Sequence, residues 1–301
     1  MKYPELKEKK FVVSIKRPGW KSLTLVCGSQ GTDLRGTALL EEGGQDYKNQ
    51  AEVTIYGVDP RWLKNYSSLA LHKGKSIYQP ETITITVGNH ILFSGDSFLT
   101  YADYSNFPNV SLKISAAFGF SAALVQRDPT YVRAGEKLRF QDVADALVWD
   151  LNKDLGLTLQ KMQISGKYTR DTRNAIIPDM TLTGTTMEKL QTLADSMGMR
   201  RLIDHTGAYF WMPGKAYPDD FLRAKPVISR DTCLIGYPSF YNEGINFSVS
   251  DIGTYKVGDR IRLKSVVPYA DGIYSLIHQR IELSTLPGGK WEMQCNAIYD
   301  F

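Results

Sequence analysis

The chain has 301 residues, 43% of them apolar, which is enough to bury the cores of about two or three domains. Its net charge of +4 is small, so the composition does not favour a dedicated nucleic-acid-binding protein. The charged N-terminus has no signal-peptide core, and no run approaches the ~18 apolar residues of a membrane span. Three distant cysteines, Cys27, Cys233 and Cys295, have no zinc-type spacing, and their odd number fits a reducing compartment.

The first 128 residues read mostly as short strands. Residues 11–17 and 22–29, separated by Pro18-Gly19, predict neighbouring antiparallel strands, and residues 31–42 continue the pattern. Residues 81–87 alternate strictly and lead through Gly88-Asn89 into 90–95, which predicts a hairpin. A further strand is expected over 110–116. About six strands with a single helix favour a small, mostly antiparallel barrel or sandwich.

Within that region, the stretch AEVTIYGVDPRWLKNYSSLAL, residues 51–71, predicts a strand followed directly by a helix. Residues 52–56 alternate and are β-branched or aromatic, as in a half-buried strand. Asp59 and Pro60 then predict the N-cap and the first residue of the helix. The apolar residues that recur at helical spacing are Leu63, Tyr66, Leu69 and Ala70. Because so short a helix is marginal alone, we expect it to pack against the sheet.

The composition changes near Asp128-Pro129, where an α+β region begins. Residues 140–155 place their apolar side chains on one helical face and end at Gly156. A second helix begins at Thr185 with capping-box spacing and ends before Gly198. Two apolar strands follow around residues 204–207, which predicts a hairpin.

Past residue 222 the sequence becomes all-β again, with strands expected over 245–251, 259–267, 272–283 and 291–301. The fold class predicted from the residues is therefore mainly β with an α+β insertion. The boundaries we expect are a first β domain over 1–128, an inserted α+β domain over 129–222 and a second β domain over 223–301. If the middle region is an insertion, Leu147 and Leu151 should pack within it rather than on the first barrel.

Two short motifs resemble catalytic or phosphate-binding loops only weakly. Residues 119–123 resemble a nucleophile elbow but lack its final glycine and the parallel sheet around it, which favours a strand end with a small turn. Residues 72–76 contain Gly-Lys-Ser but lack the first glycine of a phosphate loop, which favours a helix C-terminus. The histidines, His72, His90, His205 and His278, are isolated from one another, so no metal site is expected.

Two further groups of residues leave alternatives open. The acidic residues of the helix over 140–155 are Asp142, Asp145, Asp150 and Asp154, and solvated carboxylates are favoured there over an acid/base pair. The aromatic residues Trp149, Tyr209, Phe210 and Trp211 favour a small core over a sugar-stacking platform. We therefore expect no catalytic residue, cofactor or metal, and a carbohydrate-binding or peptidoglycan-degrading module is the alternative function.

The order of elements resembles the baseplate hub proteins of contractile-tailed bacteriophages, an architecture shared by the base of type VI secretion spikes. The resemblance lies in AEVTIYGVDPRWLKNYSSLA, the strand pair ending FSGD, and SLKISA. It continues in GTTMEKLQTLADSMGMRRLIDHTGAYFWM, which resembles the inserted domain of the hub. It ends in LIGYPSFYNEGINFSVSD, YKVGDRIRLKS and DGIYSLIHQRIELSTLPGGKWEM, which resemble its closing barrel.

This resemblance implies two tail-tube-like β-barrel or sandwich domains plus the inserted α+β domain, and assembly as a homotrimer. Three chains with two tube-like domains each would present six similar units, so that a threefold spike can join a sixfold tube. The implied partners are a second and third copy, the tail tube protein, a separate central spike protein and other baseplate proteins, with DNA only in transit. The implied location is the virion tail baseplate, after synthesis in the host cytoplasm. A tail tube or adaptor protein of related fold is the nearer alternative.

An assembled ring would also cover sheet edges such as residues 81–87. The residues we expect at the assembly interface are Val53, Ile55, Ile83, Ile85, Leu112, Ile114, Ile261 and Leu263. Because a basic channel would retain DNA, its lining should be neutral or acidic. The basic residues expected on outer or partner-facing surfaces are Lys7, Lys9, Lys10, Arg260, Arg262 and Lys264.

Overall fold

The computed structural model describes residues 9–17, 19, 21–28, 34–43, 49–66, 81–132, 137–156, 164–213, 227–241 and 244–299. The predicted motif at 72–76, with His72, and the basic residue Lys7 lie outside these ranges. Within them, no helix is both long enough and apolar enough to cross a membrane.

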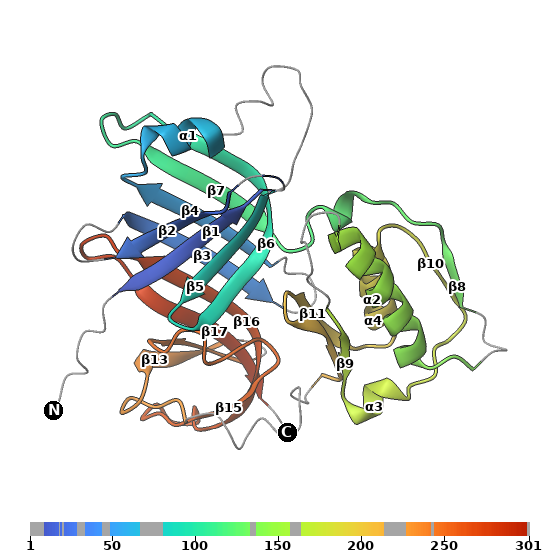
Figure 1. Cartoon of the computed structure of the whole chain (residues 1–301). Helices are drawn as coiled ribbons and strands as arrows, with labels where there is room; N and C mark the ends of the chain where they lie inside the picture. The colour runs from blue at the N-terminus through green and yellow to red at the C-terminus, as the bar shows by residue number, and fades with distance from the viewer. Residues whose placement is uncertain are drawn as a thin grey trace.

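A large antiparallel sheet dominates the described part of the chain (Figure 1). Its twelve strands follow the order β13-β14-β17-β16-β3-β4-β7-β6-β5-β1-β2, with β15 paired to β16. The strands of the first half are β1 (Lys10–Lys16), β2 (Leu23–Gly28), β3 (Arg35–Gly43), β4 (Gln50–Tyr56), β5 (Glu81–Val87), β6 (His90–Asp103) and β7 (Ser111–Ala117). Those of the second half are β13 (Leu234–Tyr241), β14 (Gly244–Val249), β15 (Arg260–Leu263), β16 (Gly272–Ser284) and β17 (Trp291–Tyr299). The mainly β fold class is therefore confirmed.

Local sequence signals determine the strands of the first half. β1 pairs with β2, and β5 pairs with β6 through a tight turn in which Val87 faces His90. Gly88 has a φ of +55°, a left-handed conformation that glycine adopts readily. Leu34, just before β3, forms a parallel bridge with Cys27 of β2. Because β3 and β2 stand at the two ends of the order of the first seven strands, this bridge closes these strands toward a barrel.

The predicted strand-to-helix unit is present. β4 leads into α1 (Pro60–Tyr66), which begins at Pro60. Asp59 Oδ1 accepts a hydrogen bond from the Arg61 N–H at 2.8 Å, as an N-cap does. Leu63 on this helix is 3% exposed and packs in the sheet core. The predicted continuation of the helix through Leu69 and Ala70 lies outside the described residues.

The two β units are joined in one sheet, because β3 of the first half pairs with β16 of the second. Seven residue pairs run along this seam, from His278↔Gly43 to Ser284↔Thr37. A single hydrophobic core fills both units, with Phe11, Ile55 and Leu276 among its fully buried members. Burying a side chain of this size contributes about 1.5–3 kcal/mol. One correction follows from this order: β5 lies between β6 and β1, so residues 81–87 are not a sheet edge.

The middle region forms a module beside the sheet (Figure 1). Its helices are α2 (Phe140–Gly156), α3 (Arg170–Arg173) and α4 (Thr186–Ser196), and its strands are β8 (Thr130–Val132), β9 (Gly166–Tyr168), β10 (Met180–Leu182), β11 (Arg200–Asp204) and β12 (Gly207–Trp211). Thr185 and Glu188 form the predicted capping box of α4. Leu147 and Leu151 lie in a core separate from that of the sheet, as expected for an insertion. The exact domain boundaries stay a prediction.

The module contacts both β units. The Asn49 side chain, just before β4, donates a hydrogen bond to the Ile203 carbonyl of β11 at 2.8 Å. Leu202 and Trp211 of the module form a small buried cluster with Val257, which precedes β15. These contacts set the module against the sheet on the side of β11.

Candidate assembly site

The eight residues expected at the assembly interface lie inside the chain. Each is at most 2% exposed and belongs to the core of the sheet: Val53, Ile55, Ile83, Ile85, Leu112, Ile114, Ile261 and Leu263. Strand alternation shows that one face is buried, but it does not show whether the same chain or a partner covers that face. Because these side chains already pack on one another, an assembly surface has to use other residues.

An exposed apolar surface lies along β13, at the end of the sheet. Among the described residues, β13 pairs only with β14, so its outer edge carries unpaired backbone groups. Ile235, Tyr237 and Phe240 are 38%, 65% and 54% exposed on this strand. We call these three residues and the free edge of β13 the β13 edge.

Sequence reasoning did not single out β13 as a strand. Gly236 and Pro238 interrupt it, and its pairing with β14 shifts register between Ile235 and Ser239. Both residue types are depleted in strand interiors, but proline is tolerated at an edge or a bulge. The available signal was the apolar residues at 235 and 237, two positions apart.

The predicted basic residues have different surroundings. Lys9 donates a hydrogen bond to the Gly289 carbonyl at 2.7 Å, so it contacts the second β unit. Lys10, Arg262 and Lys264 are exposed, whereas Arg260 is partly buried. Whether these side chains avoid a channel stays a prediction, because it depends on the assembly.

The acidic residues of α2 pair with their own neighbours. Asp142 forms an ion pair with Arg139 at 3.0 Å, and Asp150 forms one with Lys153 at 3.2 Å. Asp145 accepts a hydrogen bond from the Tyr168 hydroxyl at 2.6 Å. Burial, followed by this bond, raises the pKa of Tyr168. None of these contacts sets two carboxylates across a substrate-sized space.

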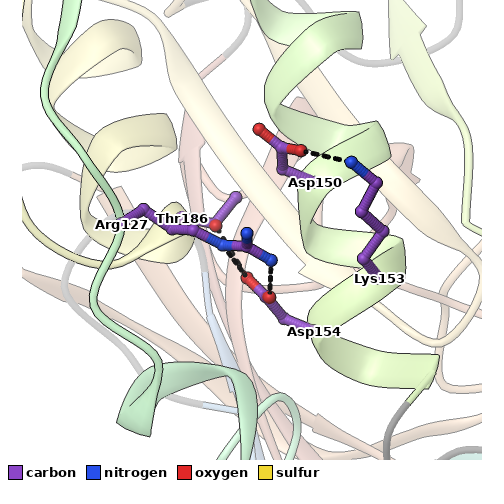
Figure 2. Close-up of polar contacts among 5 residues, drawn as sticks. All are labelled: Arg127, Asp150, Lys153, Asp154 and Thr186. Atoms are coloured by element: carbon purple, nitrogen blue, oxygen red, sulfur yellow. Dashed lines mark hydrogen bonds and ion pairs between the residues drawn. The ribbon is translucent and has the colours of Figure 1, made fainter.

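Asp154 departs from the prediction of a solvated carboxylate. It is 1% exposed and forms an ion pair with Arg127 (Figure 2). The Thr186 hydroxyl, at the start of α4, donates to Asp154 Oδ2 at 2.8 Å. The bond to Asp154 raises the pKa of Arg127. Asp154 therefore ties the end of α2 to α4 and to the chain segment that enters the module.

The aromatic residues do not form a shared sugar-stacking surface. Phe210 and Trp211 are fully buried, and Phe210 packs against Phe140 and Tyr168 in the module core. Trp149 is 63% exposed, with the Lys153 ammonium 3.1 Å from its ring centroid. The interpretation of this group as mainly a small core is the better one.

The remaining chemical candidates are also part of the fold. Ser121 lies at the start of a short 3-10 helix, η2 (Ala122–Leu124), and its N–H donates to Asp96 at 3.2 Å. Cys27, Cys233 and Cys295 are buried cysteines that take part in no disulfide bond among the described residues. His90, His205 and His278 join no cluster of potential metal ligands among the described residues.

The fold of the chain was compared with solved protein structures. The chain superposes on a tail protein from Neisseria meningitidis MC58 with a TM-score of 0.63 and 10% sequence identity, over 96% of this chain and 97% of the other. It superposes on the 43 kDa tail protein of prophage MuSo2 from Shewanella oneidensis with a TM-score of 0.60 and 10% identity, over 96% of each chain. The chain has the fold of these tail proteins.

A third structure extends the tail-protein fold to secretion systems. The E. coli c3393 protein, a component of the type VI secretion system similar in structure to the T4 bacteriophage tail proteins gp27 and gp5, gives a TM-score of 0.57 and 9% identity, over 95% of this chain and 76% of that one. The expected resemblance to hub-like tail proteins is therefore confirmed at the level of the fold. No protein-family model and no curated protein sequence matches the chain.

Proposed function

We propose that this chain is a structural protein of a contractile phage tail, the trimeric baseplate hub that joins the tail tube to the central spike. The observation that carries the proposal is the tail-protein fold over 96% of the given chain, found also in a type VI component described as similar to gp27 and gp5. In such a ring DNA would pass through the centre, and the other baseplate proteins would contact the outside. The proposed role requires no enzymatic activity.

The geometry supports self-assembly through the β13 edge. A free strand edge with exposed aromatic side chains invites pairing with another chain unless it is covered. Aromatic residues such as Tyr and Phe are enriched at the buried centres of protein–protein interfaces, where they contribute much of the binding energy. A second copy that covers this edge would bury the side chains of Tyr237 and Phe240 and pair with the outer backbone groups of β13.

The oligomeric state of the purified chain tests this proposal. Sedimentation should give a trimer for the parent, and Phe240→Ser should shift the population toward monomer by at least tenfold in the association constant, since interface anchors contribute about 2 kcal/mol or more. Tyr131→Ser is the matched control, because Tyr131 is 67% exposed on the module, away from this strand. Equal mass for the parent and both variants would remove the β13 edge from the interface.

A tail tube or adaptor role is the second candidate. The structures with the tail-protein fold include tail proteins whose position in the particle their descriptions leave open. Copy number separates the two roles, because a tube ring is expected to be sixfold and the hub threefold.

A further inference from the structure

The two β units share one order of strands. In the first unit β3, β4, β7, β6 and β5 lie side by side in this order, and in the second unit β13, β14, β17, β16 and β15 do so. The corresponding strands also follow one another in the same order along the chain, and all of these neighbours are antiparallel. β3 therefore corresponds to β13, and β6 corresponds to β16.

A bulge at the same place in both units aligns these strands residue by residue. β6 and β16 are the longest strands of their units, and each contains one extra residue against its neighbour. In β6 the bulge follows Ser97, which lies opposite Ala116 of β7. In β16 it follows Leu276, which lies opposite Ala297 of β17.

This alignment extends to both sides of the β3–β16 seam. Ala102 of β6 and Ile281 of β16 each lie five residues past the residue that precedes the bulge, so they correspond to each other. On the other side, the pairings run from β7 through β4 to β3 and from β17 through β14 to β13. They place Phe240 of β13 at the position that Leu40 has in β3.

At the seam, β3 pairs with the part of β16 that extends past the end of β15. Leu40 lies opposite Ile281 there, and both are 4% exposed. β6 likewise extends past the end of β5, as far as Asp103. The two residues that correspond to the buried pair are less covered, because Phe240 is 54% exposed and Ala102 is half-buried.

We propose that the seam is repeated between copies: β13 of one copy pairs antiparallel with the part of β6 that extends past β5 in the next copy. The proposal rests on the proposed trimeric ring and names the surface that receives the β13 edge. A ring of three needs two different, complementary surfaces on each chain, and β13 and β6 supply them. In Figure 1, β13 lies on the side of the molecule away from the module and β6 on the side next to it, so the two strands can meet only between copies.

The seam within the chain also sets the register expected between copies. The large Phe240 side chain would face the small Ala102 side chain of the next copy, and a large residue opposite a small one packs without a void or a clash. The predicted pairs are Ser239 with Asp103, Phe240 with Ala102, and Tyr241 with Tyr101 of the next copy.

Disulfide crosslinking of the full chain tests this register. Opposite residues in an antiparallel pair have Cα atoms about 4.5–5.5 Å apart, a separation that a disulfide can span. When chains with Asp103→Cys and chains with Ser239→Cys are co-expressed and oxidised with diamide, a disulfide should join the two kinds of chain. Mass spectrometry of the peptides should locate it at these two positions. The double variant should give a covalent trimer on a non-reducing gel.

The control replaces Asp103→Cys with Tyr131→Cys, because Tyr131 is 67% exposed but lies on the module. It should form no disulfide with Ser239→Cys. Asp103 forms an ion pair with Lys113 at 2.7 Å, so its loss could disturb the strand. If that variant does not fold, Tyr101→Cys with Tyr241→Cys tests the same register two residues along.

The outcomes separate this seam from the hub role. A parent that sediments as a trimer but forms no disulfide at either pair would overturn the seam and leave the hub proposal standing. A disulfide at the predicted positions within a ring of six copies would support the seam and contradict the threefold hub. A monomeric parent without the disulfide would contradict both. A control that reacts as fast as the predicted pair would show random collision and would also overturn the seam.

Discussion

Replacing Asp154 with alanine should destabilise the inserted module by about 3 kcal/mol. The Thr186 hydroxyl is fully buried and would lose its acceptor, which costs about 1–3 kcal/mol for an unsatisfied hydroxyl. Arg127 would lose its ion pair, but it is 34% exposed and can be hydrated, so this loss adds only about 1 kcal/mol. Thr186→Ala alone should cost less, about 1 kcal/mol, because the Asp154–Arg127 pair remains.

Equilibrium urea unfolding, followed by circular dichroism, measures these free energies. Asp150→Ala is the matched control: it removes a carboxylate from the same helix, but Asp150 and Lys153 are 38% and 46% exposed, so the expected cost is about 0.5 kcal/mol or less. A double-mutant cycle of Asp154→Ala with Thr186→Ala should show a coupling of about 1 kcal/mol. If Asp154→Ala costs no more than Asp150→Ala, the buried network does not hold the module together.

Three other substitutions or treatments test the packing. Leu147→Ala should destabilise the module by about 2–4 kcal/mol, because Leu147 is 3% exposed in the module core. It should lower the unfolding midpoint of the module but not that of the sheet, and an equal lowering of both midpoints would contradict a separate core. Gly244→Ala should destabilise the chain by about 3 kcal/mol in thermal unfolding, because the Cβ of the new alanine would lie 2.0 Å from the Ala297 carbonyl oxygen across the β14–β17 pair. The control Ser248→Ala, on the same strand, should cost less than about 1 kcal/mol. Burial raises the thiol pKa of Cys233 and Cys295, so alkylation at about pH 8 should be slow in the native chain and fast in urea, and equal rates would show that these thiols are open to solvent.

Much of the local structure could be predicted because it depends on neighbouring residues. The predicted helix over 140–155 is α2 (Phe140–Gly156), and the capping box at Thr185 begins α4. The hairpin at Gly88-Asn89 and the N-cap at Asp59 are also present. In each case a turn, a cap or a strict period of apolar residues is sufficient to specify the element.

The features that were not predicted depend on distant residues. The β3–β16 seam joins residues more than 200 positions apart, and alternation alone cannot identify which strand lies beside which. The burial of Asp154 follows from the approach of Arg127 and Thr186 and not from its own place on a helical face. The residues expected at the interface proved to be core for the same reason, because a buried strand face has the same pattern whichever chain covers it.

The position and number of copies in an intact tail test the proposed hub role most directly. Electron cryomicroscopy of isolated tails should show one ring of three copies at the spike end of the tube, with the β13 edge of each copy covered by its neighbour. A ring of six copies, or a tail without this chain, would contradict the proposal.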